Sequence, residues 1–385
     1  MSLTDQLARL ATFGPAPYPV VSLYLNAQPG PTGRDQFHTF VRKEFSARSR
    51  TYPVNSPERE SLDRDLEKIG NYLETDIDPS ANGVAIFACN AGELFEAVQL
   101  TAPIDQHSLY IGDQPHLYPL ARVESQFPRY AAVLADTNTA RIFVYATGEL
   151  ISEQEVKGMK TRRTSQGGWS QARYQRHIEN FHLHHAKEVV EALERVVQQE
   201  AIDTILIAGD EVILPLLREQ MPKHLSEKIV DHMKLDTDAP ADEVLKTSLA
   251  AMKRVREQSE REKVEAAIGS YRAGGLGVVG PEDTLDALIK GQVDELLIAS
   301  TVRELQGVAE GSTVQATAAA GGSENEPLVE TVAAGEAAEA PPDTVRFADE
   351  LITKATQTSS RITFVEDSSL LADYGGVAAL LRFRI

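Results

Sequence analysis

The sequence predicts an α/β protein with three domains, each built from a mixed sheet and helices. Short apolar runs typical of buried strands alternate with longer stretches in which apolar residues recur every three or four positions. At 385 residues the chain is long enough for roughly two to three separate cores. The alternation falls into three blocks, so we expect an N-terminal α/β domain over residues 1–127, a central domain over 128–268 and a C-terminal α/β domain over 269–385.

The N-terminal block is expected to contain three strands and one long helix. A strand over residues 20–25 comes first, and a charged helix follows from about 56 to 73, with its leucine and isoleucine residues on one face. Strands at 84–88 and 94–98 come next. Asn90-Ala91-Gly92 between them is typical of a hairpin turn, so these two strands should pair.

The central block begins with three strands, and the third of them is polar. A long helix follows, and its apolar residues mark one buried face. A later strand runs into the glycine turn at Gly209. The expected elements are strands at 130–136, 140–145, 150–156 and 204–210, and helices at 172–200, 212–220 and 241–264.

The C-terminal block is interrupted by a stretch of unusual composition. Strands are expected at 277–280, 295–299 and 361–365, and a last apolar run lies at 378–383. Between them, residues 304–345 carry eight acids and no cation and are rich in Ala, Gly, Glu and Pro. We expect a disordered surface insertion at about 304–345, because such a composition cannot bury enough apolar surface to fold.

The overall composition limits the kinds of partner. A formal net charge of −19 and a pI near 5.0 argue against general binding to DNA or to anionic membranes. Cys89 is the only cysteine, so no disulfide can form within the chain and no cysteine-based zinc site is expected. Met1-Ser2-Leu3-Thr4-Asp5 lacks the features of a signal peptide, and no apolar stretch reaches the length of a membrane span. We therefore expect a cytoplasmic protein without a metal or other cofactor.

One segment contradicts the acidic composition. Between Lys157 and Arg176 the chain carries six cations and no acid, and Gly167-Gly168 lies in the middle. Cations gathered around a glycine pair favour contact with a polyanion such as RNA, because neutralised phosphates release counterions. The alternative is an ordinary solvated loop in which the charges gather by chance.

Four features in the same order along the chain resemble one known family. They are the basic loop with Gly167-Gly168, the helix start Arg173-Tyr174-Gln175-Arg176, the turn Ile207-Ala208-Gly209-Asp210, and the C-terminal segments 284–298 and 374–383. Together they resemble the archaeo-eukaryotic class-one peptide chain release factors and their relative Pelota, over about residues 128–385 apart from the insertion. The N-terminal block lacks their Asn-Ile-Lys-Ser codon-reading motif. The chain therefore looks most like the bacterial members, which are similar to Vms-type peptidyl-tRNA hydrolases or to the hibernation factor Balon.

The resemblance implies both a fold and a site. The central domain should be ribonuclease-H-like, similar to the middle domain of release factors, and the C-terminal domain should resemble kink-turn-binding ribosomal proteins. In the family the loop promotes attack of water on the ester between peptide and tRNA. Trp169 rather than glutamine follows the glycine pair here, so Gln171 is the expected water-positioning residue, with Gly167 and Gly168 as a flexible entry. The alternative is that Gln171 is an ordinary residue in the first turn of the long helix. The residues expected to bind RNA are Lys160, Arg162, Arg163, Trp169, Arg173 and Arg176, with packing of Trp169 on its own domain as the alternative.

Two functions follow from the resemblance. The first is a ribosome-associated release or rescue factor that hydrolyses peptidyl-tRNA on stalled ribosomes without reading a codon. The second is a non-catalytic hibernation or protection factor that binds the A site. The expected partners are ribosomal RNA and peptidyl-tRNA, with a translational GTPase as a candidate helper.

Two clusters of polar residues suggest other sites. His182 and His185 lie three positions apart on the predicted long helix, a spacing compatible with metal ligation, but we interpret them as surface and packing residues. Asp136 and Asp210 lie at strand ends, where a metal nuclease could place carboxylates. A metal nuclease is therefore a third hypothesis, ranked below ribosome binding.

Overall fold

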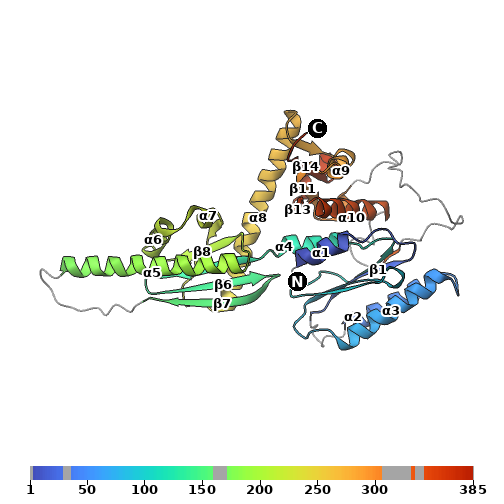
Figure 1. Cartoon of the computed structure of the whole chain (residues 1–385), viewed down its shortest axis with the longest axis horizontal. Coiled ribbons are helices and arrows are strands. Elements are labelled where there is room, and N and C mark those ends of the chain that lie inside the picture. Colours follow the sequence, from blue (N-terminus) through green and yellow to red (C-terminus); the bar gives the residue numbers. More distant parts are fainter. Residues whose placement is uncertain (1–2, 29–35, 159–170, 306–330, 334–341, 385) are drawn as a thin grey trace. The chain divides into compact units, whose positions relative to one another are not determined.

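The computed structural model describes residues 3–28, 36–158, 171–305, 331–333 and 342–384. The chain forms two compact units (Figure 1). Unit 1 combines Met1–Gln126 with Ser259–Ile385, and unit 2 is Phe127–Gln258. Among the described residues, no helix combines the length and apolar character needed to cross a bilayer. The mixed α/β class is confirmed, and the two outer blocks share one unit instead of forming a unit each.

The first sheet of unit 1 has five strands in the order β12-β4-β1-β2-β3, and all neighbours are antiparallel. Its helices α2 and α3 pack on one face, where Leu23, Leu62, Ile69 and Ile86 form part of a buried cluster. The expected hairpin is present, with η1 (Asn90–Gly92) as its turn. The elements are α1 (Leu3–Ala11), β1 (Val20–Asn26), α2 (Gln36–Ser49), α3 (Pro57–Thr75), β2 (Gly83–Cys89), β3 (Leu94–Leu100), β4 (Ser108–Gly112) and α4 (Tyr118–Gln126).

The second sheet of unit 1 is mixed, in the order β10-β14-β11-β13. Strands β11 and β13 are parallel, and β14 pairs antiparallel with β10 and β11. The last part of α8 covers it, where Val264 and Ala267 pack with Leu297 and Ala378. The elements are β10 (Gly277–Val279), α9 (Pro281–Ile289), β11 (Val293–Ala299), η2 (Val302–Glu304), α10 (Pro342–Gln357), β13 (Arg361–Val365), η4 (Ser368–Leu370), η5 (Ala372–Tyr374) and β14 (Val377–Leu381).

Part of the expected insertion at 304–345 is structured. Strand β12 (Thr331–Ala333) pairs antiparallel with β4, and α10 begins at Pro342. The expectation of disorder is therefore wrong for these residues, while 306–330 and 334–341 lie outside the described part. A sheet edge supplies unpaired backbone N–H and C=O groups, so a segment can pair there whatever its side-chain composition.

Unit 2 is a mixed five-stranded sheet in the order β7-β6-β5-β8-β9. Strands β7, β6 and β5 are antiparallel, whereas β8 and β9 run parallel to β5. This order agrees with the ribonuclease-H-like topology expected for the central block. The elements are β5 (Tyr130–Ala135), β6 (Thr139–Ala146), β7 (Glu149–Lys157), α5 (Gln171–Gln199), β8 (Ile205–Gly209), α6 (Ile213–Gln220), α7 (Lys223–Ser226), β9 (Ile229–His232) and the start of α8 (Ala241–Arg272).

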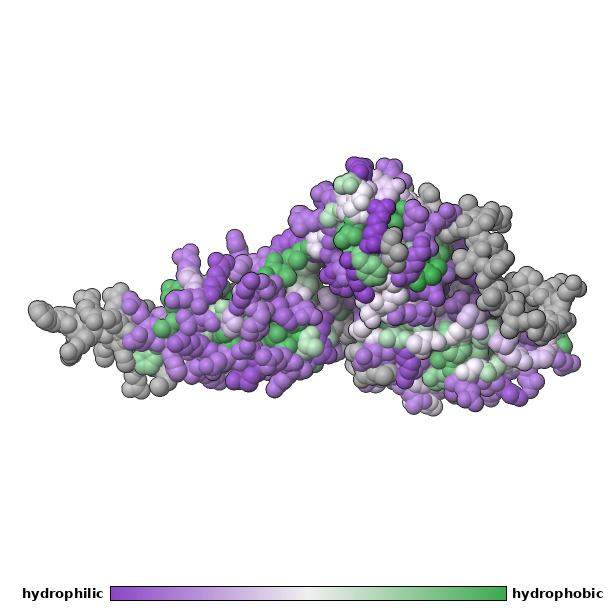
Figure 2. All heavy atoms as spheres, turned by 45° about the horizontal axis from the view of Figure 1, so that its top comes forward, coloured by the Kyte–Doolittle hydropathy of each residue, from purple (hydrophilic) through white to green (hydrophobic). Residues whose placement is uncertain are grey.

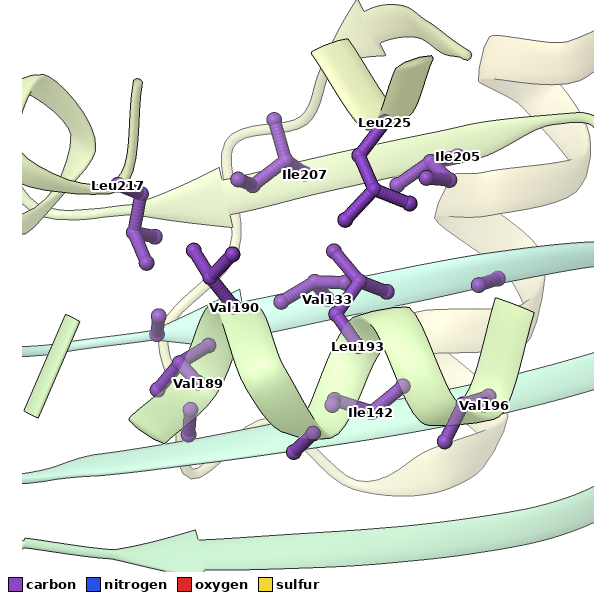
Figure 3. Packing of buried hydrophobic residues seen from close by; sticks show 14 of the residues in the cluster. Val133, Ile142, Val189, Val190, Leu193, Val196, Ile205, Ile207, Leu217 and Leu225 are labelled. Atoms are coloured by element: carbon purple, nitrogen blue, oxygen red, sulfur yellow. The ribbon is translucent and has the colours of Figure 1, made fainter. Parts of the chain in front are cut away.

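Both faces of this sheet are buried. On one face α5 packs against the strands through residues such as Val189, Leu193 and Val196, which meet Val133 and Ile142 (Figure 3). On the other face Tyr130, Phe143 and Tyr145 pack with Val244 and Ala251 of α8. The apolar layers on the two faces hold the sheet in place. They therefore also hold the end of β7 and the packed part of α5 in fixed positions.

Candidate functional site

The basic loop lies between the end of β7 and the start of α5. Gly167, Gly168 and Trp169 lie outside the described residues, as do Lys160, Arg162 and Arg163. Gln171 is the first residue of α5, and Arg173 and Arg176 follow in its first two turns. Their backbone is helical, but the side chains of residues 171–177 also lie outside the described part. The structure therefore places the strand before the loop and the helix after it. The catalytic and RNA-binding roles expected for the loop residues stay predictions.

The helix that follows the loop is packed along only part of its length. The first buried residue in the described part of α5 is His185, and the buried positions continue through Val189, Leu193 and Val197. Residues 178–184 are exposed or half-buried. The part of α5 from Gln171 to His184 amounts to about 20 Å of helix, and Figure 1 shows it extending beyond the end of the strands. The helix therefore carries Gln171 away from the core of unit 2.

Strand β7 on the other side of the loop is a polar edge strand. Most of its residues are exposed, and it pairs only with β6 among the described strands. The Arg141 side chain on β6 is bound by groups of unit 2, because its Nε is 2.7 Å from Glu153 Oε1 and its Nη1 donates to the Ala239 carbonyl at 2.6 Å. Lys157 at the end of β7 pairs with Glu155 at 2.9 Å but stays largely exposed. Of these two cations, only Lys157 is placed to face solvent near the loop.

The loop leaves the sheet at Gly158, over a buried histidine. The Gly158 N–H donates to the carbonyl of Asn138 at 2.8 Å, which extends the β6–β7 pairing by one residue. A Cβ at position 158 would lie 2.9 Å from His185 Nδ1 and 3.0 Å from the Asn138 carbonyl oxygen. Only glycine fits this close approach without displacing a neighbour. Gly158 is not among the site residues predicted from the sequence, although a glycine directly after a strand and before a cationic run is a usable signal.

His185 has an unusual environment for a polar side chain. It is only 2% exposed, and neither ring nitrogen has a hydrogen-bond partner among the described residues. The closest carboxylate oxygen, on Glu188, is 4.0 Å from Nδ1. His184 beside it is exposed and 3.4 Å from the same carboxylate group. In the part of the chain that the structure describes, no group of three or more His, Cys, Asp or Glu side chains is arranged to hold a metal ion.

The two aspartates considered for a metal nuclease have local structural roles. Asp136 accepts from the backbone N–H groups of Asn138 and Thr139 and from the hydroxyls of Thr139 and Thr237. Burial alone would raise the pKa of Asp136, but these hydrogen bonds hold it below the usual value. Asp210 Oδ1 accepts from the N–H groups of Val212 and Ile213 at 2.9 and 2.7 Å and so caps the start of α6. Neither carboxylate needs a metal to explain its position.

Comparison with known proteins gives one family match. Residues 115–253 match the model of bacterial archaeo-eukaryotic release factor family 10. This range includes β5 to β9, the loop and the first part of α8. No curated protein matches the chain.

Solved structures give a weaker likeness. An archaeal translation termination factor, aRF1, is 19% identical, with 99% of this chain and 98% of that chain covered and a TM-score of 0.26. The Pelota of Archaeoglobus fulgidus is 16% identical over 79% of this chain and 80% of that chain, with a TM-score of 0.33. A ribosome-bound archaeal Pelota is 14% identical over 100% and 95%, with a TM-score of 0.40. TM-scores this low do not establish a shared arrangement of the whole chain.

Proposed function

We propose that this chain, whose residues 115–253 match the model of bacterial archaeo-eukaryotic release factor family 10, is a ribosome-associated rescue factor. In this proposal it hydrolyses peptidyl-tRNA on stalled ribosomes without reading a codon. The observation that carries the proposal is that the family match contains the loop in which six cations surround Gly167-Gly168 in a chain of net charge −19. A local basic segment on an acidic protein favours one oriented contact with RNA over general binding.

The geometry of α5 supports the same function. A loop that acts inside the ribosome has to extend from its own domain, because a tip packed on its own core cannot reach a buried tRNA end. The part of α5 before the first buried residue of its described side chains, His185, provides about 20 Å of helix for this purpose. The packed second part, with Leu193 and Val196 in the core, holds that extension rigidly on the sheet.

The proposed chemistry needs few groups from the protein. The oxygen of a water molecule forms a bond to the ester carbonyl carbon, the bond from that carbon to the tRNA 3′ oxygen breaks, and this oxygen takes up a proton. Gln171 positions the water without bringing a charge into the site, and Gly167 and Gly168 let the backbone approach RNA closely. A backbone N–H at the tip can stabilise the developing oxyanion. The loop cations bind RNA phosphates, and Trp169 stacks on a base.

Release from stalled ribosome–nascent-chain complexes tests the catalytic role. Wild-type protein should free the peptide, and Gln171→Ala should lower the single-turnover rate by about 100-fold, the cost of losing one positioned polar group. Gln198→Ala is the matched control, because Gln198 is an exposed glutamine near the other end of the same helix. No release by the wild type, or equal release by Gln171→Ala, would reject the catalytic proposal.

Salt-dependent ribosome binding tests the RNA contacts. Charge reversal in Arg173→Glu/Arg176→Glu should weaken binding and lower the slope of log K against log salt by about 1.4 to 1.8, the value for two lost phosphate contacts. Lys187→Glu/Arg195→Glu is the control, since it makes the same charge change at exposed positions on the packed part of α5. Equal slopes for the two variants would remove the assigned RNA contacts.

One observation favours a second function. Trp169 stands directly after the glycine pair, where the family's glutamine would be expected. A tip without glutamine at that position suits a hibernation or protection factor that occupies the A site without hydrolysis. Stable binding to vacant ribosomes, together with unhydrolysed peptidyl-tRNA after prolonged incubation, would select this function.

A further inference from the structure

We propose that unit 1 carries a second RNA-binding surface, at the end of its C-terminal sheet, which takes single-stranded RNA. The surface consists of Tyr271, Arg272, Leu276, Phe383 and Arg384 and is called the α8–β10 surface below. It goes beyond the function proposed above, because it lies in the other unit of the chain and does not depend on hydrolysis.

The surface forms where two chain segments run side by side. Helix α8 ends at Arg272, and a short glycine-containing turn leads to β10. The end of β14 and the residues after it lie along this turn, because the Leu381 N–H donates to the Leu276 carbonyl at 2.9 Å and Arg384 Nη1 donates to the Gly274 carbonyl at 2.8 Å. Figure 1 shows the end of α8 and the C-terminal end of the chain together at the top of the view.

Two arginines on this surface keep their charge available. Arg272 Nη2 donates to the Tyr374 hydroxyl at 2.9 Å, and Arg384 Nη1 donates to the carbonyls of Gly274 and Gly275. Neither arginine has a carboxylate partner among the described residues. The neighbouring Arg382 is different, since its Nε lies 3.5 Å from Asp294. Guanidinium groups held by neutral oxygens remain free to bind phosphate, and a second, bidentate contact is open to them.

Apolar side chains lie exposed beside these cations. Tyr271 is 45% exposed, Leu276 43% and Phe383 47%, and they account for three of the eight large hydrophobic side chains exposed in the described residues. Figure 2 brings this end of the molecule toward the viewer and shows hydrophobic (green) and hydrophilic (purple) residues next to each other. Exposed aromatic rings on the same surface as arginines are typical of proteins that stack unpaired bases while they bind the backbone.

The turn itself favours a nucleic acid strand. Gly274 has φ +69°, a left-handed conformation that glycine adopts without strain, and a Cβ there would meet no atom within 4 Å. The turn therefore has open space above Gly274. A phosphate backbone can therefore approach the arginines without displacing protein atoms. An acidic peptide would use the arginines but has no need of two exposed rings, so RNA fits the full set of residues better.

RNA binding by the full chain tests this surface. All variants are made in the Arg173→Glu/Arg176→Glu background, which weakens RNA binding by the loop and keeps its remaining contribution the same in every protein compared. A fluorescent 12-nucleotide oligouridine serves as the probe in anisotropy measurements at several salt concentrations. Arg272→Glu/Arg384→Glu should weaken binding at least tenfold and lower the salt slope by about 1.4, as expected for two phosphate contacts on a single strand. Phe383→Ala should weaken binding about tenfold with an unchanged slope, because stacking does not release counterions.

The controls separate this surface from general electrostatics and from the proposed ribosomal function. Arg42→Glu/Arg64→Glu makes the same charge change at exposed positions of α2 and α3 and should leave the affinity within about twofold. Equal losses for the two double variants, or full affinity in Phe383→Ala, would overturn the proposal. So would displacement of the probe by a glutamate-rich peptide at a lower concentration than by unlabelled RNA. None of these outcomes bears on peptide release, which is measured separately with Gln171→Ala.

Discussion

Asp349 on α10 is joined to the segment at the start of α4 by three hydrogen bonds. Its Oδ2 is 2.6 Å from His116 Nδ1, and its Oδ1 accepts from the N–H groups of Leu117 and Tyr118 at 2.8 and 3.0 Å. The last two donors lie at the start of α4, so Asp349 caps that helix from α10, more than 200 positions away in the chain. No local pattern around residue 118 predicts this cap, because the usual capping side chain directly precedes its helix.

Removing this carboxylate should be costly. Asp349→Ala leaves three buried donors without an acceptor, and we expect the free energy of unfolding to fall by about 3 to 5 kcal/mol. Asp349→Asn keeps an acceptor oxygen and should lose less. Chemical denaturation measures both, with Asp373→Ala as a surface control. A loss in Asp349→Ala no larger than that in the control would contradict the assigned role.

Asp65 is the clearest titrating group in the interior of unit 1. It is 1% exposed, and burial raises its pKa to about 6, although the Asn90 N–H and Lys68 act in the opposite direction. The folded protein therefore keeps a proton on Asp65 up to about pH 6, whereas an unfolded chain loses it near pH 4. More protons are bound by the folded state between these values, so the contribution of Asp65 to stability falls as pH rises through that window.

Asp65→Asn should remove this pH dependence. The amide still accepts from Asn90, and nothing remains to be ionised at that position. The difference in unfolding free energy between variant and wild type should grow in favour of the variant from pH 4 to pH 7. Glu67→Gln, at an exposed position on the same helix, controls for the change in surface charge. A constant difference across this pH range would show that Asp65 does not titrate as inferred.

Helix α5 shows what can and cannot be predicted at the scale of an element. Apolar spacing predicts a helix at 172–200, and the structure has it at Gln171–Gln199. The same spacing predicts Ile178 and Phe181 on the buried face, but both are only half-buried and the core begins at His185. Periodicity identifies a face of a helix, whereas the length of the sheet beneath it decides how much of that face is covered.

The contact beneath Gly158 should govern the root of the loop. In Gly158→Ala the new Cβ would meet His185 Nδ1 and the Asn138 carbonyl, so the hydrogen bond from Gly158 N–H to Asn138 should weaken. Hydrogen exchange at residue 158 should then accelerate by at least tenfold, and peptide release should slow. Gly158→Ala/His185→Ala should partly restore both, since it removes the ring. Unchanged exchange in Gly158→Ala would mean that the close approach does not constrain the loop.

Glycine at a different position gives the opposite effect. Gly70 lies inside α3, and a Cβ there would meet no atom within 4 Å. Gly70→Ala should therefore raise the free energy of unfolding by about 0.5 to 1 kcal/mol, because alanine loses less conformational entropy than glycine when it becomes part of a helix. Denaturation of the two proteins under the same conditions measures this gain. A destabilised Gly70→Ala would show that the helix surface at this position is occupied.

At the scale of the whole molecule, local patterns predict elements better than they predict how elements combine. Apolar runs gave the buried strands β2, β5, β8 and β11, because their composition alone indicates burial on both faces. They missed β12, which forms through backbone pairing. They also separated the outer blocks, which α10 joins through Asp349 and through Gln357, whose Nε2 donates to the Ala11 carbonyl at 2.7 Å. Such long-range contacts leave no periodic signal in the sequence.

The expected site divides in the same way. Charge and glycine content pointed to the loop between β7 and α5, and the structure places one end of this loop on the edge strand β7 and the other at the start of helix α5. The supporting residues Gly158, Asn138 and His185 were not predicted as a group, because they come from three elements that meet only in the folded unit. In unit 2 the packed sheet and helices therefore support a basic loop whose function is the one proposed above.

A cryo-electron microscopy map of the full chain on stalled ribosomes is the most direct test of that loop. We expect residues 167–171 to lie beside the CCA end of the P-site tRNA. Arg173 and Arg176 should contact ribosomal RNA, and α5 should be extended along its whole length. A map in which the chain binds with this loop turned away from the tRNA, or in which no complex forms at physiological salt, would contradict this expectation.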